Sequence, residues 1–388
     1  MDFTLGERSD IFREEARAFL AEAFTPEVKE TMHETGVHHN WDFHKALVEK
    51  GWLAPGWPVE YGGQGRDPME MLAFSEEFQR AGAPTYGVGT TIMVSSILRH
   101  LGTEEQKQEF LPRALRGEII IVLGFTEPES GSDVAAAQTR AVRDGDEWII
   151  NGQKMFTTNA QEGDYAFMLT RTNPDVPKHQ GLTTFLVPLR QEGVEIQAVR
   201  TLSGERTNLT FYNDVRVPDA MRIGEVDGGW DVMTVGLTFE RSGAQGGESI
   251  RLLEEMEEWV LSAHDDDGNP RREDPDVLAR LGKAAAENEV SSLMGRRSAW
   301  VHDTGGMPGV EGSMGKLFSS EALTRQSGDF VDLLGADGIR SQGDPSAIQG
   351  GAADYAFRFA LGATTYGGTS EVQRNIIAQR GLGLPRAK

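Results

Sequence analysis

The 388-residue chain contains no cysteine, which excludes a disulfide framework, a thiolate metal site and a cysteine nucleophile. Positive charge is also scarce, since 38 Lys and Arg residues stand against 60 Asp and Glu residues, for a formal net charge of −22. Nucleic acids and anionic membrane surfaces are held largely through Lys and Arg, so we expect no binding to either. An anionic ligand would have to be held by local donors.

Long apolar runs are missing as well. No window approaches the roughly 18 uninterrupted apolar residues of a transmembrane helix, and the N-terminus lacks the basic region and apolar run of a secretory signal. The longest apolar run, residues 119–125, has the length and β-branched content of a strand. We therefore expect no membrane insertion and a cytoplasmic location.

Helical patterns occupy both ends of the chain. Thr103 with Gln106 forms a capping-box pattern, and apolar residues at helical spacing continue through residues 1–117. Further helical stretches are expected at 231–263, 275–303, 314–334 and 369–381.

The middle part has a different pattern. Short β-branched and aromatic runs alternate with turn residues, which is typical of a compact β-barrel or sandwich. Asp144-Gly145 is a strong hairpin signal, because glycine tolerates a positive φ. We predict an α+β protein with a helical domain over 1–117, a β-barrel domain over 118–226 and a C-terminal helical-bundle domain over 227–388.

Common catalytic motifs are absent: there is no G-x-S-x-G, no G-x-G-x-x-G opening a helix and no H-E-x-x-H. Four histidines form a loose cluster without the spacing of metal ligands, so we interpret them as solvated surface residues and expect no metal site. They are His33, His38, His39 and His44.

Two segments of the middle part are unusual. Residues 124–133 form a loop of Thr, Ser and Gly that can present hydroxyl and N–H groups to a polar planar ligand, or be an ordinary β-turn. Asn151-Gly152 is expected to form a hairpin turn, with Phe156 and Thr158 on one face of the returning strand. This pair can stack on a ring and bond its edge, or be a core Phe beside a cross-strand Thr.

Two segments of the C-terminal part also stand out. One places Glu240 beside Arg241 inside a predicted helix, where a carboxylate can be a base or simply a solvated charge. The other, residues 364–375, has two glycines before Thr and Ser at a helix start, which can cradle a ligand or cap a helix.

Five segments recur in a characteristic order along almost the whole chain. They are Gly102–Gln106 with Phe110-Leu111-Pro112, Thr126-Glu127-Pro128 with Gly131-Ser132-Asp133, Asn151–Lys154 with Thr157–Ala160, Phe211–Pro218, and Gly368–Glu371 with Gln373-Arg374. In this order and spacing they resemble the acyl-CoA dehydrogenase family of flavoproteins. The resemblance implies a helix–β-barrel–helix fold, bound FAD and a homo-oligomer, commonly a tetramer of paired dimers.

The chemistry of this family is the α,β-dehydrogenation of an acyl thioester. A carboxylate removes the α-proton while the β-hydrogen leaves as a hydride to flavin N5. Because the α-proton is weakly acidic, donors at the thioester oxygen must stabilise the developing enolate. The resemblance implies that these donors are a flavin ribityl hydroxyl and the backbone N–H of Gly367.

One departure from the family pattern determines which residue we expect to be the base. Many members carry the catalytic Glu at the position occupied here by Gly367, which has no side chain. A smaller branch, similar to the isovaleryl-CoA and long-chain acyl-CoA dehydrogenases, carries it on a helix just before an Arg. Glu240 before Arg241 fits that branch, so Glu240 is the expected base and Arg241 its orienting partner.

The resemblance also implies the remaining contacts. Either Arg271 or Arg272 would replace a family Arg that holds FAD across a dimer. Expected cofactor contacts are Leu123, Phe125, Thr126, Gly131, Ser132, Phe156, Thr157, Thr158, Gly335, Thr369 and Glu371. Expected substrate contacts are Ser132, Phe239, Arg241, Gly367 and Gly368.

The implied partners are an acyl-CoA substrate and an electron-transfer flavoprotein or a similar acceptor. The substitutions resemble those of actinobacterial relatives that act on steroid side chains or other bulky acyl groups. Two alternatives remain open: a flavin monooxygenase or oxidase on the same fold, and a subunit that pairs with a homologous second chain.

Overall fold

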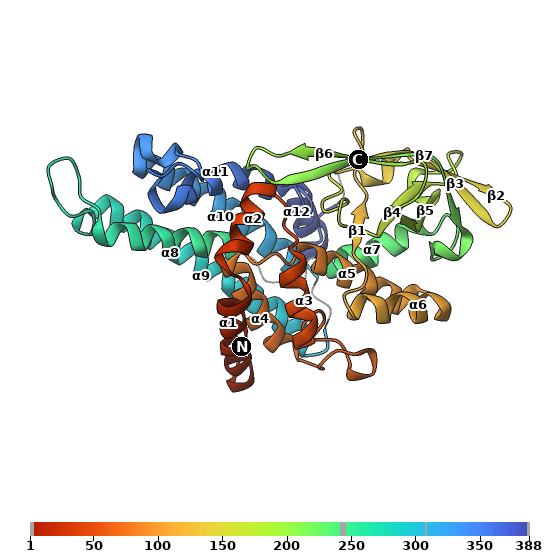
Figure 1. Ribbon diagram of the computed structural model, residues 1–388, viewed down its shortest axis with the longest axis horizontal. Coiled ribbons are helices and arrows are strands. Elements are labelled where there is room, and N and C mark those ends of the chain that lie inside the picture. The colour runs from red at the N-terminus through yellow and green to blue at the C-terminus, as the bar shows by residue number, and fades with distance from the viewer. Residues whose placement is uncertain (1–3, 241–245, 307–308, 386–388) are drawn as a thin grey trace. The chain divides into compact units, whose positions relative to one another are not determined.

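The computed structural model describes residues 4–240, 246–306 and 309–385. The predicted order of helices, sheet and helices is confirmed (Figure 1). At the start of α6 the expected capping box is present, since Thr103 accepts from the N–H of Gln106 and Gln106 accepts from that of Thr103. The helices before the sheet are α1 (Glu7–Ala23), α2 (Pro26–Thr35), α3 (Trp41–Lys50), α4 (Pro68–Ala81), α5 (Tyr86–Leu101) and α6 (Glu104–Leu115).

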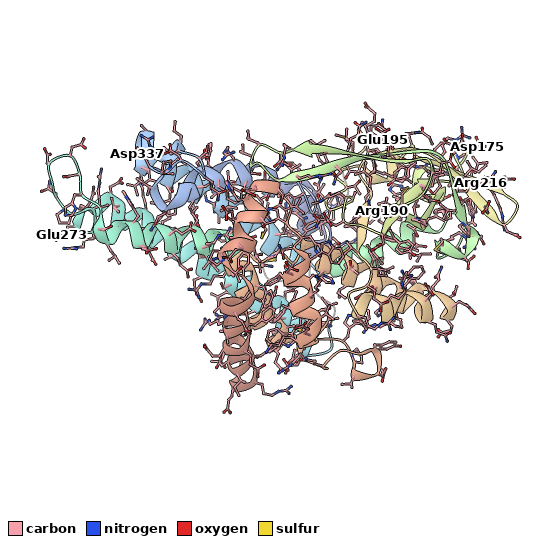
Figure 2. All side chains as sticks on the ribbon, in the orientation of Figure 1. Asp175, Arg190, Glu195, Arg216, Glu273 and Asp337 are labelled. Atoms are coloured by element: carbon pink, nitrogen blue, oxygen red, sulfur yellow. The ribbon has the colours of Figure 1, made fainter. Side chains whose placement is uncertain are left out.

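The strands form one eight-stranded sheet in the order β6-β7-β3-β2-β4-β5-β8, with β1 added in parallel to β4. Buried side chains from six of the strands share one apolar core, so the sheet encloses its own interior. Figure 2 shows Arg216 on β7, where it bonds Glu147 and Asp144 across the neighbouring strands. The strands are β1 (Ile121–Gly124), β2 (Arg140–Asp144), β3 (Glu147–Lys154), β4 (Tyr165–Arg171), β5 (Leu182–Pro188), β6 (Val194–Arg200), β7 (Arg206–Pro218) and β8 (Arg222–Ile223).

One of the two expected hairpin turns is confirmed and the other is wrong. β2 and β3 are joined at Asp144-Gly145, where Gly145 has a φ of 65°. Asn151 and Gly152, in contrast, lie inside β3, where its register with β7 shifts. Asn151 and Asp214 exchange two hydrogen bonds of 2.9 Å, and Asp214 has a φ of 51°. The irregular backbone therefore forms a β-bulge rather than a turn.

The C-terminal helices differ from the expected stretches in two places. The stretch predicted at 231–263 is two helices, α7 and α8. Helix α11 was not expected, and its buried residues are four alanines and Asp354, without a large apolar side chain. The helices are α7 (Gly229–Glu240), α8 (Gly247–Ser262), α9 (Pro275–Asp303), α10 (Glu311–Leu334), α11 (Ala352–Ala363) and α12 (Ser370–Ile376).

The chain divides into two compact units, each with its own core. The bundle unit comprises residues 1–20, 67–83 and 241–388, and its core lies between α8, α9, α10 and α11. The sheet unit comprises residues 21–66 and 84–240, and a second core cluster joins its sheet to α5, α6 and α7. Within the described part of the chain, no helix combines the length and apolar content needed to cross a bilayer.

Candidate functional site

The loop that leaves β1 is closed by a single carboxylate. Glu127 is 5% exposed and accepts from the backbone N–H groups of Gln138 at 2.6 Å and Thr139 at 3.0 Å. Its own backbone exchanges two hydrogen bonds with Ser130, of 3.0 and 3.1 Å. The two ends of the loop over 124–139 are therefore tied together beneath its surface.

A fully buried lysine completes this support. Lys154, the last residue of β3, donates to Glu127 Oε1 at 2.7 Å and to the backbone oxygens of Leu169 at 2.6 Å and Phe125 at 3.3 Å. Burial lowers the pKa of Lys154 against the pull of its partner. Burial also raises the pKa of Glu127, but the Lys154 charge and hydrogen bond, together with the hydrogen bonds from the Gln138 and Thr139 N–H groups, hold that pKa below its usual value.

We assigned no role to this pair from the sequence. The available signal was that Glu127 and Lys154 stand in the two segments that resemble flavin-binding motifs. Their 27-residue separation gave no reason to pair them, because the contact depends on which strands are neighbours.

The outer surface of the same loop carries the predicted cofactor contacts. Leu123, Phe125 and Thr126 are half-buried, whereas Gly131 and Ser132 are exposed. The Phe125 ring is fixed from below by the core ring of Phe167, with centroids 5.5 Å apart and a steep tilt. Thr126 and Ser132 therefore offer hydroxyl groups on a supported surface.

The second predicted flavin segment ends in a tight turn rather than continuing as a strand. β3 stops at Lys154, and Phe156 has a φ of 55° and a ring that is 57% exposed. The N–H of Thr158 bonds the Phe156 oxygen at 2.9 Å, and its hydroxyl lies 3.0 Å from that of Thr207. The expected strand alternation at Phe156 and Thr158 is thus wrong, because the positive φ turns the chain out of the sheet.

The two loops belong to one surface within the sheet unit. The N–H of Met155 bonds the Thr126 oxygen at 2.8 Å. Thr157 lies below this surface, fully buried, with its hydroxyl 3.2 Å from that of Thr210 and its N–H on the Asn208 oxygen at 3.0 Å. Its expected contact with a cofactor stays a prediction.

Buried polar groups without partners lie in the same loops. Among the described residues, neither the Asn159 amide nor the Ser130 hydroxyl has a hydrogen-bond partner, although Asn159 is 0% exposed. Such groups are costly to bury unless a ligand or water completes them. With the exposed Phe156 ring and the hydroxyls around it, this uncharged donor set fits the planar, polar-edged ring of FAD.

The expected base lies at the end of a helix. α7 packs on α5 and β5 within the sheet unit, with Val232 and Met233 buried, and Glu240 is its last residue. The side chains of Phe239 and Glu240, and Arg241 as a whole, lie outside the described residues.

The remaining predicted contacts lie in the bundle unit. Gly367 and Gly368, between α11 and α12, have φ values of 63° and 87°. Thr369 caps α12 by accepting from the Val372 N–H at 3.2 Å. Glu371 is exposed in the first turn of that helix, and Gly335, also exposed, ends α10.

The segment between α8 and α9, which contains the two arginines of which one is expected to hold FAD, carries more negative than positive charge. Arg271 bonds Asp274 at 3.2 Å, and Arg272 bonds the Leu261 oxygen at 3.3 Å. Figure 2 shows Glu273 in the same segment. Because five carboxylates accompany these two arginines over residues 263–274, the segment is poorly suited to a pyrophosphate.

Two of the histidines expected at the surface are buried. His39 is 6% exposed and His44 is 3% exposed, with ring centroids 5.2 Å apart and Trp41 against both. The prediction was wrong for these two because the tertiary packing of aromatic rings covers them. Burial, with a contribution from His44, lowers the pKa of His39 to about 4. The described residues contain no group of three His or acidic side chains placed to hold a metal.

Comparison with known proteins gives three family matches that follow one another along the chain. Their descriptions are acyl-CoA dehydrogenase, N-terminal domain, over residues 6–118; middle domain, over 122–214; and C-terminal domain, over 227–382.

Individual proteins match over nearly their whole length. The acyl-CoA dehydrogenase FadE26 of Mycobacterium tuberculosis is 37% identical, with 97% of this chain and 96% of the relative covered. A chain of the ChsE4-ChsE5 complex from the same organism matches with a TM-score of 0.90, 36% identity and full coverage of both chains. A chain of the Tcur3481-Tcur3483 steroid ACAD has a TM-score of 0.90, 35% identity and full coverage of both.

Proposed function

The chain belongs to the acyl-CoA dehydrogenase family, and from this premise we propose that it oxidises an acyl-CoA thioester to the trans-2-enoyl-CoA with Glu240 as its base. The observation that carries the proposal is the match to all three domains of the family in their order. FAD is the cofactor of this family, and when bound it accepts the β-hydrogen as a hydride at N5.

Glu240 is assigned to the α-proton for two reasons. Position 367 is a glycine and supplies no carboxylate, and Glu240 stands on a helix directly before Arg241, as in one branch of the family. The backbone N–H of Gly367 would donate to the thioester oxygen and stabilise the negative charge that develops there. Arg241 would orient the base rather than act as an acid.

Side chains of the sheet unit would hold the cofactor ring. The exposed Phe156 ring supports stacking on one face, and the hydroxyls of Thr126 and Thr158 support hydrogen bonds to its edge. Ser132 would lie near the thioester-bearing ligand. In the bundle unit, Thr369 and Glu371 would meet the pyrophosphate or adenosine side, with Glu371 accepting from a ribose hydroxyl or a backbone N–H.

The test is anaerobic bleaching of the bound flavin by a panel of short, branched, long and steroid acyl-CoAs. Wild type should bleach with at least one of them. Glu240→Gln should slow the bleaching by about a thousandfold, within the range for loss of a general base. The exposed Glu60→Gln serves as the matched control and should bleach like wild type.

Two outcomes would contradict the assignment. Unchanged bleaching in Glu240→Gln would remove Glu240 as the base. Oxygen consumption that keeps pace with substrate oxidation would identify an oxidase instead of a dehydrogenase.

We further propose a bulky acyl substrate, of the steroid type named for the Tcur3481-Tcur3483 enzyme, and pairing with a homologous second chain. Two observations support a heteromer: the similarity to one chain of the ChsE4-ChsE5 complex, and the carboxylate-rich segment over 263–274 where the family holds FAD across a dimer. The mass and composition of the natively isolated assembly test it, since a second polypeptide is expected and a pure homotetramer would contradict it.

Three other expectations stay predictions. They are the domain boundaries at 117/118 and 226/227, the cytoplasmic location, and transfer of electrons to an electron-transfer flavoprotein. Reoxidation of the reduced enzyme by such an acceptor tests the last of these.

A further inference from the structure

The loop that joins α11 to α12 has its backbone oxygens held from inside the bundle unit. The side-chain amide of Gln373 donates to the Gly367 oxygen at 2.8 Å and to the Gly368 oxygen at 3.3 Å. The ammonium group of Lys316, on α10, donates to the same Gly368 oxygen at 2.8 Å. On the other side of the loop, the N–H of Tyr366 bonds the Gly362 oxygen at 3.1 Å.

Both donors are buried. Gln373 is 0% exposed and Lys316 is 9% exposed. A lysine is almost never buried without a specific partner, because its charge loses hydration. The fit around the loop is also tight, since a Cβ at Gly368 would lie 2.7 Å from Gln373 Nε2. A side chain at position 368 would therefore push the amide away from both oxygens.

This arrangement also sets the direction of the N–H groups. In a trans peptide the C=O and the N–H point in opposite directions. Because Lys316 and Gln373 draw the oxygens of Gly367 and Gly368 inward, the N–H groups of the same two peptides, those of Gly368 and Thr369, point away from these side chains. The Gly367 N–H belongs to the preceding peptide, which the φ of 63° at Gly367 joins to the held one. Within the described residues, the N–H groups of Gly367, Gly368 and Thr369 have no hydrogen-bond acceptor. Three consecutive free N–H groups are suited to a carbonyl oxygen that gains negative charge.

We propose that Lys316 and Gln373 are positioning residues of the dehydrogenation. They hold Gly367 and Gly368 in the left-handed conformation that presents the loop N–H groups to the thioester oxygen. Lys316 also places a positive charge behind the peptide that follows Gly368, which polarises its N–H and strengthens it as a donor. This inference rests on the proposed function, in which the thioester binds the N–H of Gly367; Lys316 and Gln373 act on that N–H by fixing the backbone of Gly367 and Gly368 that follows it.

The first test uses Lys316→Met, which keeps the length of the stem and removes the donor and the charge. The kcat for acyl-CoA oxidation should fall by about 10- to 100-fold, less than the loss of a direct oxyanion donor, while KM changes little. Lys316→Arg should restore most of the rate. The control is Lys283→Met, which removes an exposed lysine of α9 that pairs with Asp329, and it should match wild type.

The second test measures the hydrogen bonds at the thioester directly. Bound enoyl-CoA with a 13C label at its carbonyl carbon gives a C=O stretch that difference infrared spectroscopy resolves without turnover. Wild type should lower this frequency relative to free enoyl-CoA. Lys316→Met and Gln373→Met should each return it part of the way to the free value, with the melting temperature of each protein recorded alongside.

Each outcome separates the two proposals. If wild type shifts the carbonyl and both variants shift it equally, Lys316 and Gln373 only support the fold and the inference is overturned, whatever happens to their melting temperatures. If the wild-type protein does not lower the carbonyl stretching frequency and no acyl-CoA reduces its flavin, the proposed function fails and the inference fails with it.

Discussion

Two regions of the molecule, the loop after β1 in the sheet unit and helix α8 in the bundle unit, hold buried charge differently. In the sheet unit, the ammonium group of Lys154 is 0% exposed and meets the carboxylate of Glu127 at 2.7 Å, and backbone groups complete both partners. In the bundle unit, α8 carries Glu255 among other carboxylates of the same helix. Burial raises the pKa of Glu255 to about 7, because its effect exceeds the opposing effect of the Arg251 charge.

This difference shows what each region can tolerate. The sheet unit buries a matched pair whose loss would leave one charge alone, so its loop is rigid but sensitive to substitution. Helix α8 crowds charges of one sign, because Glu248, Glu254 and Glu258 also raise the pKa of Glu255. Elsewhere in the bundle unit a buried carboxylate is paired, as Glu77 is with Arg13 and Arg17. The stability of the region around α8 should therefore depend more on pH than on the loss of any one carboxylate.

The largest expected effect is on the matched pair. Glu127→Gln should lower the free energy of unfolding by about 3 to 5 kcal/mol, because the Lys154 ammonium is left buried without its counter-charge. The affinity for FAD should fall as well, since Glu127 closes the loop that carries Thr126 and Ser132. Urea unfolding and FAD titration of the apoprotein measure the two effects.

The double variant Glu127→Gln/Lys154→Met tests the cause. It should recover part of the lost stability, because it removes the isolated charge along with its partner. Two single losses that simply add up in the double variant would show that the pair is not coupled.

The order of the domains and the Asp144-Gly145 hairpin could be predicted because each depends on local sequence. The bulge at Asn151 could not, since it requires Asp214, which comes from another strand 63 residues away. The Glu127–Lys154 pair could not be predicted for the same reason, because strand pairing decides which carboxylate of this acidic chain meets which lysine.

The candidate site shows a similar division. Phe156 and Thr126 are predicted cofactor contacts because they stand in or beside segments that resemble family motifs, whereas Lys316 stands in a stretch, 314–334, that the sequence predicts only as a helix. Its contact with the Gly368 oxygen appears only in the folded chain, where α10 approaches the loop before α12. Local signals thus predict groups that could touch a ligand more readily than the groups that hold them in place.

A smaller effect is expected from acid in the sheet unit. His39 has a pKa of about 4 when folded and an ordinary value near 6.5 when unfolded, so the unfolded state binds more protons between these values. Stability should therefore fall as the pH drops from 6.5 to 4. His39→Phe should remove up to about 3 kcal/mol of this loss in urea unfolding measured across that range.

The exposed His33→Phe is the matched control for His39 and should keep the acid sensitivity of wild type. An unchanged pH profile in His39→Phe would mean that the ring of His39 has the same pKa in the folded and unfolded states, against its packing between Trp41 and His44.

The smallest effect is expected from Glu255, and its sign is opposite. The pKa of this carboxyl is about 7 when folded and near its ordinary value of 4.5 when unfolded, so folding favours the protonated form. Stability should be greatest at and below pH 4.5 and should decline as the pH rises through 7. Since Glu255 keeps some contact with solvent, Glu255→Gln should gain only about 1 to 2 kcal/mol over wild type at pH 8.

Glu257, two residues further along α8 and therefore on the opposite side of the helix, is exposed, so Glu257→Gln provides the comparison for Glu255. It removes one negative charge from α8 without removing a buried one, so its stability should follow that of wild type from pH 5 to 8. If Glu255→Gln and Glu257→Gln gained the same stability at pH 8, the overall charge of the helix would account for the effect. The contrast between the matched pair beneath the β1 loop and the crowded carboxylates of α8 would then hold only for the matched pair.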